Sequence, residues 1–273
     1  MALTGHEYSY FRQLQPMSAR MQCRTEAIVL KTIDYGESDQ IVTFYTREYG
    51  KIKGIAKGAR RSKKRFVNAL EPFSCSEINF SRRNPDNLDF IDGCDVSSHF
   101  PEIRSSLEKT LAASYLIELM DQFTPENKKS EGSFQLLHDF LVLMEKKTLS
   151  DALLRFFEIR LLRISGYDPV LDYCISCRAP LENGTTYRFD SVKGGIICNS
   201  CKTGTSDAIP VSLGTIKTLL LGREMEAESL GRLIFTAQSA EESRRILSHF
   251  IRHILGRELK SLNVLNEISR LYR

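Results

Sequence analysis

Four cysteines near the middle of the chain have the spacing of a metal site. Two pairs each enclose two residues, and 20 residues separate the pairs: Cys174 and Cys177, then Cys198 and Cys201. In this arrangement each pair forms a tight turn, and the four thiolates converge on one tetrahedral Zn²⁺. Four protein ligands leave no coordination position for water. The spacing therefore predicts a structural zinc ribbon rather than a catalytic zinc.

Disulfides and an iron–sulfur cluster are the alternatives for these thiols. The seven cysteines are an odd number, and the first 20 residues lack the short apolar core of a secretory signal, so a reducing compartment is favoured. Ferredoxin-type clusters use other spacings. Zinc is therefore the favoured occupant of the four-cysteine site, and the cytoplasm is the expected location. No run approaches the roughly 18 apolar residues of a membrane span, so no membrane partner is expected.

Basic residues are concentrated in two short segments, although the net charge is only +4. Six of the nine residues from Lys57 to Arg65 are Lys or Arg, and residues 244–273 hold seven Lys or Arg against two Glu. Cations in a glycine-flanked loop follow a phosphate backbone without reading bases, whereas the alternative is a merely solvated charge cluster. The candidate DNA-binding residues are Lys57, Arg60, Arg61, Lys63, Lys64, Arg65, Arg252, Arg257 and Lys260.

Short alternating or β-branched runs follow residue 20 and are separated by Gly, Asn, Asp and Pro. They cover 27–30, 40–45, 51–55, 75–80 and 88–91. Such runs predict β-strands. The small size, the number of strands (about five) and the presence of glycine within a strand favour an OB-fold β-barrel over residues 21–100, with an SH3-like barrel as the alternative. Residues 1–20 show no clean period and are expected to be a disordered extension, with translation starting at Met21 as the alternative.

Aromatic residues of this region are a further type of candidate, because bases stack on aromatic rings in single-strand binders. The candidates are Phe44, Tyr45, Phe66 and Phe73. An aromatic residue in a small barrel more often fills the core, so we favour a core position for each of them and take none as a site residue.

Beyond Pro101 the apolar period becomes helical. Apolar residues recur every fourth position from Ile103 through Leu107 to Leu119, and Pro101 occupies a helix start. Residues 101–273 are therefore predicted to form a mainly α-helical domain, with the ribbon at about 172–204 inserted between its third and fourth helices. A second helix is predicted to begin at Ser133, and a third lies between an N-cap at Ser150 and an end before Gly166. A fourth is predicted to begin near Pro210 and Ser212, and the last two cover 240–255 and 261–271.

The chain lacks the common signatures of an enzyme. It has no nucleophile elbow, no phosphate-cradling Gly-Lys-Ser/Thr loop and no convincing carboxylate cluster. His249 and His253 are four residues apart, as in zinc proteases, but Phe250 stands where such a protease has its glutamate base. We therefore expect a binding protein rather than an enzyme, with a zinc-ribbon nucleic-acid-processing enzyme as the alternative function.

Several separated motifs resemble the bacterial recombination mediator family RecO. Toward the start they lie at 25–39, at 58–61 (Gly-Ala-Arg-Arg) and at 70–73 (Leu-Glu-Pro-Phe). Further along they lie at 166–172 (Gly-Tyr-Asp-Pro-Val-Leu-Asp), at the glycines 194 and 195 before Cys198, and at 255–261 (Leu-Gly-Arg-Glu-Leu-Lys-Ser). Because the motifs keep one order over residues 21–261, the resemblance is more specific than any single motif.

The resemblance implies an OB-fold followed by a helical domain with a zinc ribbon. It also implies a mediator of recombinational DNA repair that binds single- and double-stranded DNA, anneals complementary strands and helps to load recombinase onto DNA coated with single-strand-binding protein. The implied partners are RecR and the acidic C-terminal tail of single-strand-binding protein, with RecF and the RecA filament as further partners. The implied location is the nucleoid.

Overall fold

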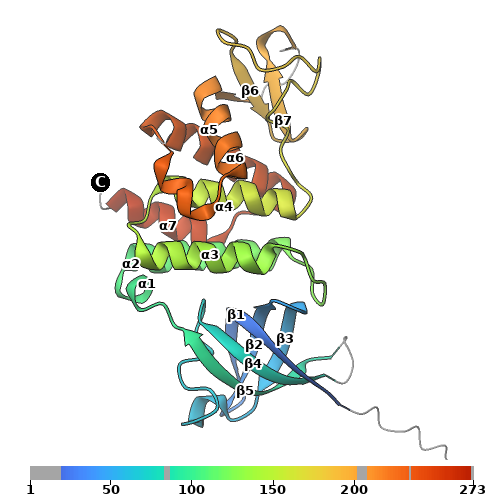
Figure 1. Ribbon diagram of the computed structural model, residues 1–273, viewed down its shortest axis with the longest axis vertical. Coiled ribbons are helices and arrows are strands. Elements are labelled where there is room, and N and C mark those ends of the chain that lie inside the picture. The colour runs from blue at the N-terminus through green and yellow to red at the C-terminus, as the bar shows by residue number, and fades with distance from the viewer. Residues whose placement is uncertain (1–19, 83–86, 202–207, 234, 272–273) are drawn as a thin grey trace, which may run out of the picture.

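The computed structural model describes residues 20–82, 87–201, 208–233 and 235–271. Apart from Arg20, the expected extension over 1–20 lies outside these residues. Figure 1 shows a β-barrel at one end of the molecule, a group of helices in the middle and a small sheet at the other end. Within the described residues, no helix has both the length and the apolar composition to cross a bilayer.

Five strands close the barrel in the order β1-β2-β3-β5-β4. All neighbouring pairs are antiparallel except β3 with β5, which is parallel. The bounds are β1 Met21–Tyr35, β2 Asp39–Thr46, β3 Gly50–Ala56, β4 Cys75–Arg82 and β5 Asp89–Ser98. Gly54 permits the closure, because a Cβ there would lie 2.4 Å from Ile91 Cδ1. The prediction of a five-stranded OB-like barrel is confirmed.

The helical region contains seven α-helices within the described residues. They are α1 Pro101–Ser105, α2 Leu107–Phe123, α3 Ser133–Lys146, α4 Asp151–Ile164, α5 Leu213–Glu224, α6 Ala237–Leu255 and α7 Lys260–Leu271. Helices α3 and α4 begin where their sequence signals place them, and Gly166 just after α4 has φ +84°, which glycine tolerates. The Ser212 hydroxyl caps α5 by accepting from Thr215 N at 3.3 Å.

The first predicted helix is interrupted, which corrects the sequence interpretation. Ser106 has extended backbone angles (φ −114°, ψ 120°), and its hydroxyl accepts from Lys109 N to start α2. Leu107, counted in the apolar period, is 54% exposed. The period therefore crosses a break between α1 and α2, and Ser106 ends one helix and caps the next.

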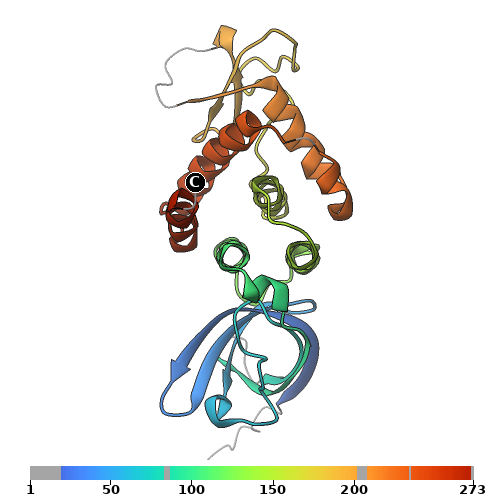
Figure 2. The same ribbon diagram turned by 90° about the vertical axis from the view of Figure 1, so that its left-hand side faces the viewer.

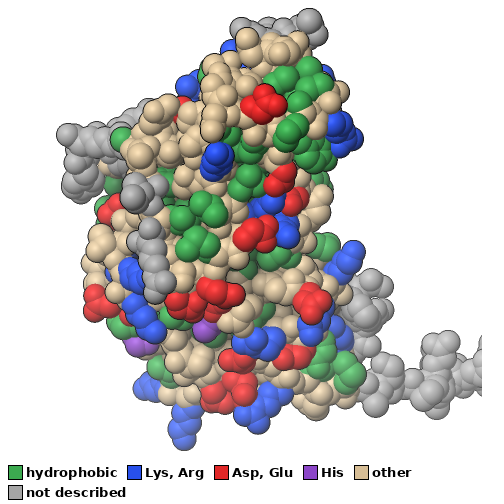
Figure 3. All heavy atoms as spheres, turned by 45° about the horizontal axis from the view of Figure 1, so that its top comes forward, with side chains coloured by type: hydrophobic (Ala, Val, Ile, Leu, Met, Phe, Trp, Pro, Cys, Tyr) green, Lys and Arg blue, Asp and Glu red, His purple; other side chains and the backbone are tan. Residues whose placement is uncertain are grey.

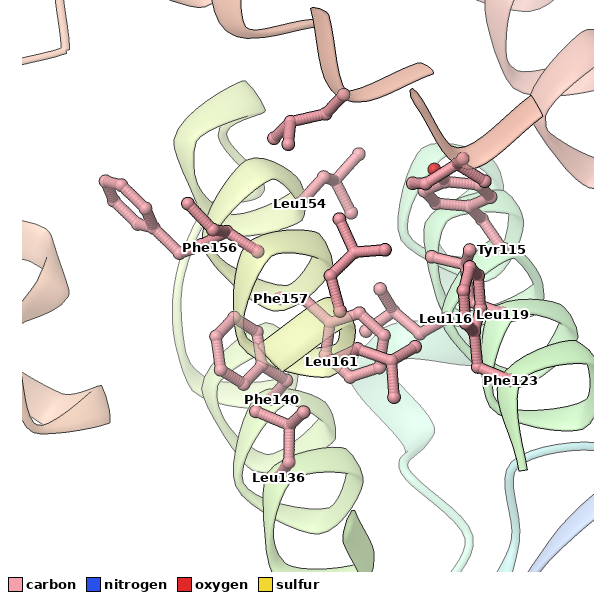
Figure 4. Packing of buried hydrophobic residues seen from close by; sticks show 14 of the residues in the cluster. Tyr115, Leu116, Leu119, Phe123, Leu136, Phe140, Leu154, Phe156, Phe157 and Leu161 are labelled. Atoms are coloured by element: carbon pink, nitrogen blue, oxygen red, sulfur yellow. The ribbon is translucent and has the colours of Figure 1, made fainter. Parts of the chain in front are cut away.

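One hydrophobic core joins the helices to the barrel. Figure 4 shows leucine and aromatic side chains of α2, α3 and α4 pointing toward one another, with Phe140 and Phe157 in an edge-to-face contact at 5.3 Å between centroids. Ile28 and Tyr45 of the barrel belong to the same core. In Figure 2 α2 and α3 rest directly on the barrel, so the two regions share an apolar interface.

A three-stranded sheet follows α4 and precedes α5, at the predicted place of the ribbon. Its strands are β6 Tyr187–Asp190, β7 Gly195–Cys198 and β8 Ile209–Val211, in the order β7-β6-β8. Phe189 of β6 packs edge to face on Phe250 of α6, with 5.5 Å between the ring centroids. This contact fixes the sheet to the helices. Pro210, expected to announce a helix, lies in β8 instead.

Candidate metal centre and nucleic-acid interface

The first cysteine pair lies on a loop that is bound to the ribbon sheet. Cys174 N donates to Ala179 O at 2.9 Å, and Arg178 N donates to Cys174 O at 2.8 Å, which closes a tight turn around Cys177. Ile175 N donates to Ile196 O of β7 at 2.9 Å. The loop therefore lies directly against the strand that carries the second pair.

The second pair is positioned by β7 and the turn after it. Cys198 ends β7 and pairs with Tyr187 of β6, and Cys201 ends the single 3-10 turn Asn199–Cys201. Gly195 makes the close approach of the first loop possible, because a Cβ there would lie 2.4 Å from Ile175 Cγ2. The glycine is therefore required by the packing of the two knuckles.

The four sulfur atoms form a compact cluster. Those of Cys174, Cys177, Cys198 and Cys201 all lie within 4.8 Å of one another. Cys177 Sγ is 3.8 Å from Cys198 Sγ. Ligands 2.3 Å from a tetrahedral zinc ion are about 3.8 Å apart, whereas a disulfide bond is about 2.05 Å long. The cysteines are free thiols in an arrangement able to hold a metal, and the disulfide alternative is excluded for this structure.

Backbone dipoles of the two knuckles favour a thiolate at Cys174. Burial opposes ionisation, but hydrogen bonds from the backbone N–H groups of Cys177, Cys198 and Ser176 outweigh it and lower the pKa of the Cys174 thiol to about 6. Hydrogen bonds with the Cys177 and Cys198 side chains raise the pKa of Cys201 to about 12. A coordinated dication deprotonates such thiols outright, and four thiolates complete a tetrahedral shell.

The basic loop, residues 57–65, is anchored to the barrel while its cations stay exposed. Ala59 and Phe66 are buried, and Arg60 N donates to Ser38 O at 3.0 Å. All six Lys and Arg side chains of the loop are exposed. The loop begins after Ala56, about 17 Å along β3 from Lys51, whose Nζ bonds Asp121 of α2. The basic loop therefore lies at the barrel end away from the helices.

The cations of this loop have different partners. Arg60 Nε lies 3.6 Å from Asp34 Oδ2, and Arg61 Nη2 lies 3.7 Å from Glu37 Oε2. Arg65 Nη2 donates to Lys57 O at 2.8 Å. Within the described residues, Lys63 and Lys64 make no ion pair or side-chain hydrogen bond. These two lysines therefore have the ammonium groups most available to a phosphate.

The cations near the chain end lie elsewhere. Arg252 and Arg257 line one cleft of about 160 Å³ between α6 and α7, and Arg252 pairs with Glu258 at 3.4 Å. Arg257 donates to Gln122 of α2, and the backbone N–H of Lys260 donates to Glu118. In Figures 1 and 2, α6 and α7 belong to the helical region in the middle of the molecule and not to the barrel. Arg252 and Arg257 therefore share a cleft that Lys260 does not line, and the three residues lie on the helical region and not at the basic loop.

The remaining candidates have structural positions. Phe44, Tyr45, Phe66 and Phe73 are all at most 5% exposed, so the prediction that they belong to the core is confirmed. His249 lines the cleft between α6 and α7, and burial together with the charges of Arg252 and Arg245 lowers its pKa.

On the face shown in Figure 3, the Lys and Arg side chains (blue) are interspersed with Asp and Glu (red) and form no large patch of one sign.

Sequence reasoning missed a groove of about 600 Å³ between the starts of α2 and α4 and the helices α6 and α7. Its walls carry five leucines, and both charge signs line it. The lining leucines are Leu107, Leu149, Leu154, Leu262 and Leu265, and the charged residues are Glu108, Asp151, Arg155 and Arg244. The sequence feature that could have indicated this groove is Arg155, because it places a cation within the apolar face of α4.

Arg155 belongs to a buried polar network at the side of this groove. Its side chain is 2% exposed, and Nη2 lies 2.8 Å from Glu158 Oε1, which also accepts from the Tyr115 hydroxyl at 2.6 Å. Burial raises the pKa of both Glu158 and Tyr115. Arg155 Nε and Nη1 have no hydrogen-bond partner within the described part of the chain. Two unpaired donors are thus buried beside the groove, whose wall carries both leucines and charged residues.

Comparisons with known proteins agree with this architecture. Residues 17–100 match the family model described as "Recombination protein O N terminal", and residues 104–263 match "Recombination protein O C terminal". The chain is 54% identical over 257 residues to "DNA repair protein RecO" of Syntrophus aciditrophicus (strain SB), covering 93% of this chain and 99% of that protein.

A relative of the same name from Geobacter metallireducens (strain ATCC 53774 / DSM 7210 / GS-15) is 38% identical over 245 residues, which are 90% of this chain and 97% of the relative. Another, from Anaeromyxobacter dehalogenans (strain 2CP-C), is 35% identical over 89% of this chain and 96% of the relative. Both halves of the fold are therefore matched in order. The chain belongs to the RecO family of DNA repair and recombination proteins.

Proposed function

We propose that this chain is a non-enzymatic recombination mediator. It binds single- and double-stranded DNA, anneals complementary strands and helps to load recombinase onto DNA coated with single-strand-binding protein. The observation that carries the proposal is the basic loop, whose six exposed cations lie on a segment anchored to the barrel. Phosphate contacts of this kind are independent of sequence and screen the repulsion between two strands, as annealing requires.

The metal of the cysteine cluster is proposed to be zinc with a structural role. Four thiolates in a tetrahedral arrangement suit Zn²⁺ and leave no open position for a substrate. The ion would cross-link the two knuckles, which are otherwise connected to the helices only through a short β-sheet. Its contribution would be to folding and not to any chemical step.

Salt dependence tests the role of the basic loop. If all six cations contact single-stranded DNA, log affinity falls with log salt at a slope of about −4, taking about −0.7 per contact. The double variant K63A/K64A removes the two loop cations that make neither an ion pair nor a side-chain hydrogen bond within the described residues, and it should reduce the slope by about 1.4. Fluorescence anisotropy of a labelled oligonucleotide at several salt concentrations measures both slopes. An unchanged slope would exclude these lysines from the contact.

The groove beside Arg155 is the proposed site for the tail of single-strand-binding protein. The apolar end of an acidic peptide fits between the leucines, and the partly exposed Arg244 guanidinium offers a partner for a carboxylate. Glu108 and Asp151 on the same rim disfavour acidic groups on their side. They therefore orient the peptide with its carboxylates toward Arg244.

A charge reversal tests this docking site. The variant R244E should weaken binding of a fluorescent tail peptide about tenfold or more, because a charge-assisted contact becomes repulsive. K217E is the matched control, since Lys217 is an exposed cation on α5 that does not line the groove. Equal weakening by both variants would point to nonspecific electrostatics and would remove the groove from the proposal.

The wider partners follow from family membership alone. RecR, RecF and the RecA filament are proposed as assembly partners, and the nucleoid within the cytoplasm is proposed as the place of action. Arg252, Arg257 and Lys260 are proposed as a second set of DNA contacts. Because they lie apart from the basic loop, one bound strand would have to pass from the barrel end to the helices to reach both sets.

A further inference from the structure

Four apolar side chains form a single row across the barrel. Ile33 on β1 pairs with Ile41 on β2, Ile41 pairs with Ile55 on β3, and Ile55 pairs with Phe90 on β5. We call these four residues the outer row. Side chains of directly paired residues lie on the same face of a sheet. Since neighbouring strands are about 4.8 Å apart, the row is continuous over about 14 Å.

The outer row faces away from the barrel core. The chain neighbours Val42 and Ile91 are buried inside the barrel, and side chains alternate between the two faces of a strand. Ile33 is 49% exposed, and Ile41, Ile55 and Phe90 are half-buried. None of the four belongs to either hydrophobic core or packs against one. This apolar surface is therefore not part of either hydrophobic core.

Cations flank the outer row on both sides. Lys31 pairs with Thr43, and Thr43 pairs with Lys53, so both lysines stand on the same face one row nearer the helices. Lys53 also pairs with Glu126. On the other side, Lys57 Nζ lies 5.5 Å and Arg20 Cζ 4.9 Å from the centroid of the Phe90 ring. Apolar surface therefore alternates with positive charge across this face.

We propose that the outer row is the base-contacting track of a single-stranded DNA site, with Phe90 as the ring on which a base stacks. This deepens the proposed function, on which it rests. Base–aromatic stacking and a cationic path for the backbone are the two components of sequence-independent single-strand binding. Lys57 belongs to both the basic loop and the flank of Phe90, so the track continues the phosphate path of the loop.

The track distinguishes single strands from duplexes. In a duplex the base faces are stacked on one another and the backbones lie outside, so only the flanking cations have a partner. In a single strand the unstacked bases cover the isoleucines and Phe90, which removes apolar surface from water. The outer row should therefore add affinity that does not depend on salt and is specific to single strands.

A tryptophan reporter tests the stacking directly. The chain contains no tryptophan, so F90W introduces one indole at the proposed site. Titration with an oligodeoxythymidylate should quench at least half of the F90W emission at saturation. V192W is the control, because Val192 lies in the ribbon and is 74% exposed, and its emission should stay unchanged. Unquenched F90W emission, with normal binding by anisotropy of a labelled oligonucleotide, would overturn the proposal.

A second variant tests the isoleucines without changing the charge. I41T/I55T keeps the β-branched shape that suits a strand and removes apolar surface. We expect about tenfold weaker binding to single-stranded DNA at an unchanged salt slope, with no change for a duplex or for an abasic strand of equal length. Equal loss on the abasic strand, or no loss at all, would overturn the track. Absence of DNA binding by the wild type would instead refute the proposed function itself.

Discussion

Replacing Cys198 by serine is expected to abolish metal binding and to unfold the ribbon. Cys198 is buried at the end of β7, and its backbone N–H also donates to Cys174 Sγ at 3.3 Å. Metal binding supplies roughly 10 to 16 kcal/mol to small structural zinc sites near neutral pH. A three-stranded sheet with strands of three or four residues has little core of its own to replace that contribution.

The measurements for C198S are the metal content of the purified protein and limited proteolysis of residues 172–211. Wild-type protein should contain one zinc per chain, and C198S none, with faster cleavage in the ribbon and a lower soluble yield. S200A is the matched control, because Ser200 is an exposed neighbour in the same knuckle and offers no thiolate. Metal-free wild-type protein, or a C198S variant with normal protease resistance, would contradict a structural metal.

Removing five cations of the basic loop should have the second largest effect. In R60A/R61A/K63A/K64A/R65A only Lys57 remains of the six, so the salt slope for single-stranded DNA should fall from about −4 to about −1. At low salt the affinity should drop by two to three orders of magnitude, on the order expected when most phosphate contacts are lost. The buried anchors Ala59 and Phe66 are unchanged, and the replaced side chains are exposed, so the barrel should remain folded.

The control for this variant removes the same charge elsewhere. Five exposed lysines of the helical domain are suitable: Lys128, Lys129, Lys146, Lys147 and Lys217. If total positive charge were sufficient, both five-alanine variants would lose affinity equally. A loss confined to the loop variant supports a local contact, and an unchanged loop variant would exclude the loop from DNA binding. Thermal unfolding of both variants checks that each is folded.

The metal cluster could be predicted because its information is local. Each cysteine pair spans four residues, so the turn alone brings two thiols together, and the odd cysteine count argued against disulfides. The strands of the ribbon were not predicted, because β6, β7 and β8 have only three or four residues each and show no alternation long enough to recognise. Their stability depends on Phe189 against Phe250, a contact between distant segments.

The barrel and most helices could be predicted from periodicity, but the surfaces between elements could not. The apolar period that continues through Leu107 hides the break at Ser106, because an extended residue leaves no trace in the spacing of apolar residues. The groove combines Leu107 of α2, Leu149 of the loop before α4 and Leu262 of α7, which only tertiary packing brings together. The outer row depends on strand register, which turns and bulges set and composition does not.

Strand annealing on DNA coated with single-strand-binding protein tests the central claim most directly. The claim is that exposed cations of the basic loop hold two strands side by side without any chemical step. Complementary coated strands should anneal quickly with wild-type protein and with the helical-domain control, without nucleotide, and at least tenfold more slowly with the five-alanine loop variant. Equal annealing rates for all three proteins, or a requirement for nucleotide hydrolysis, would contradict this account.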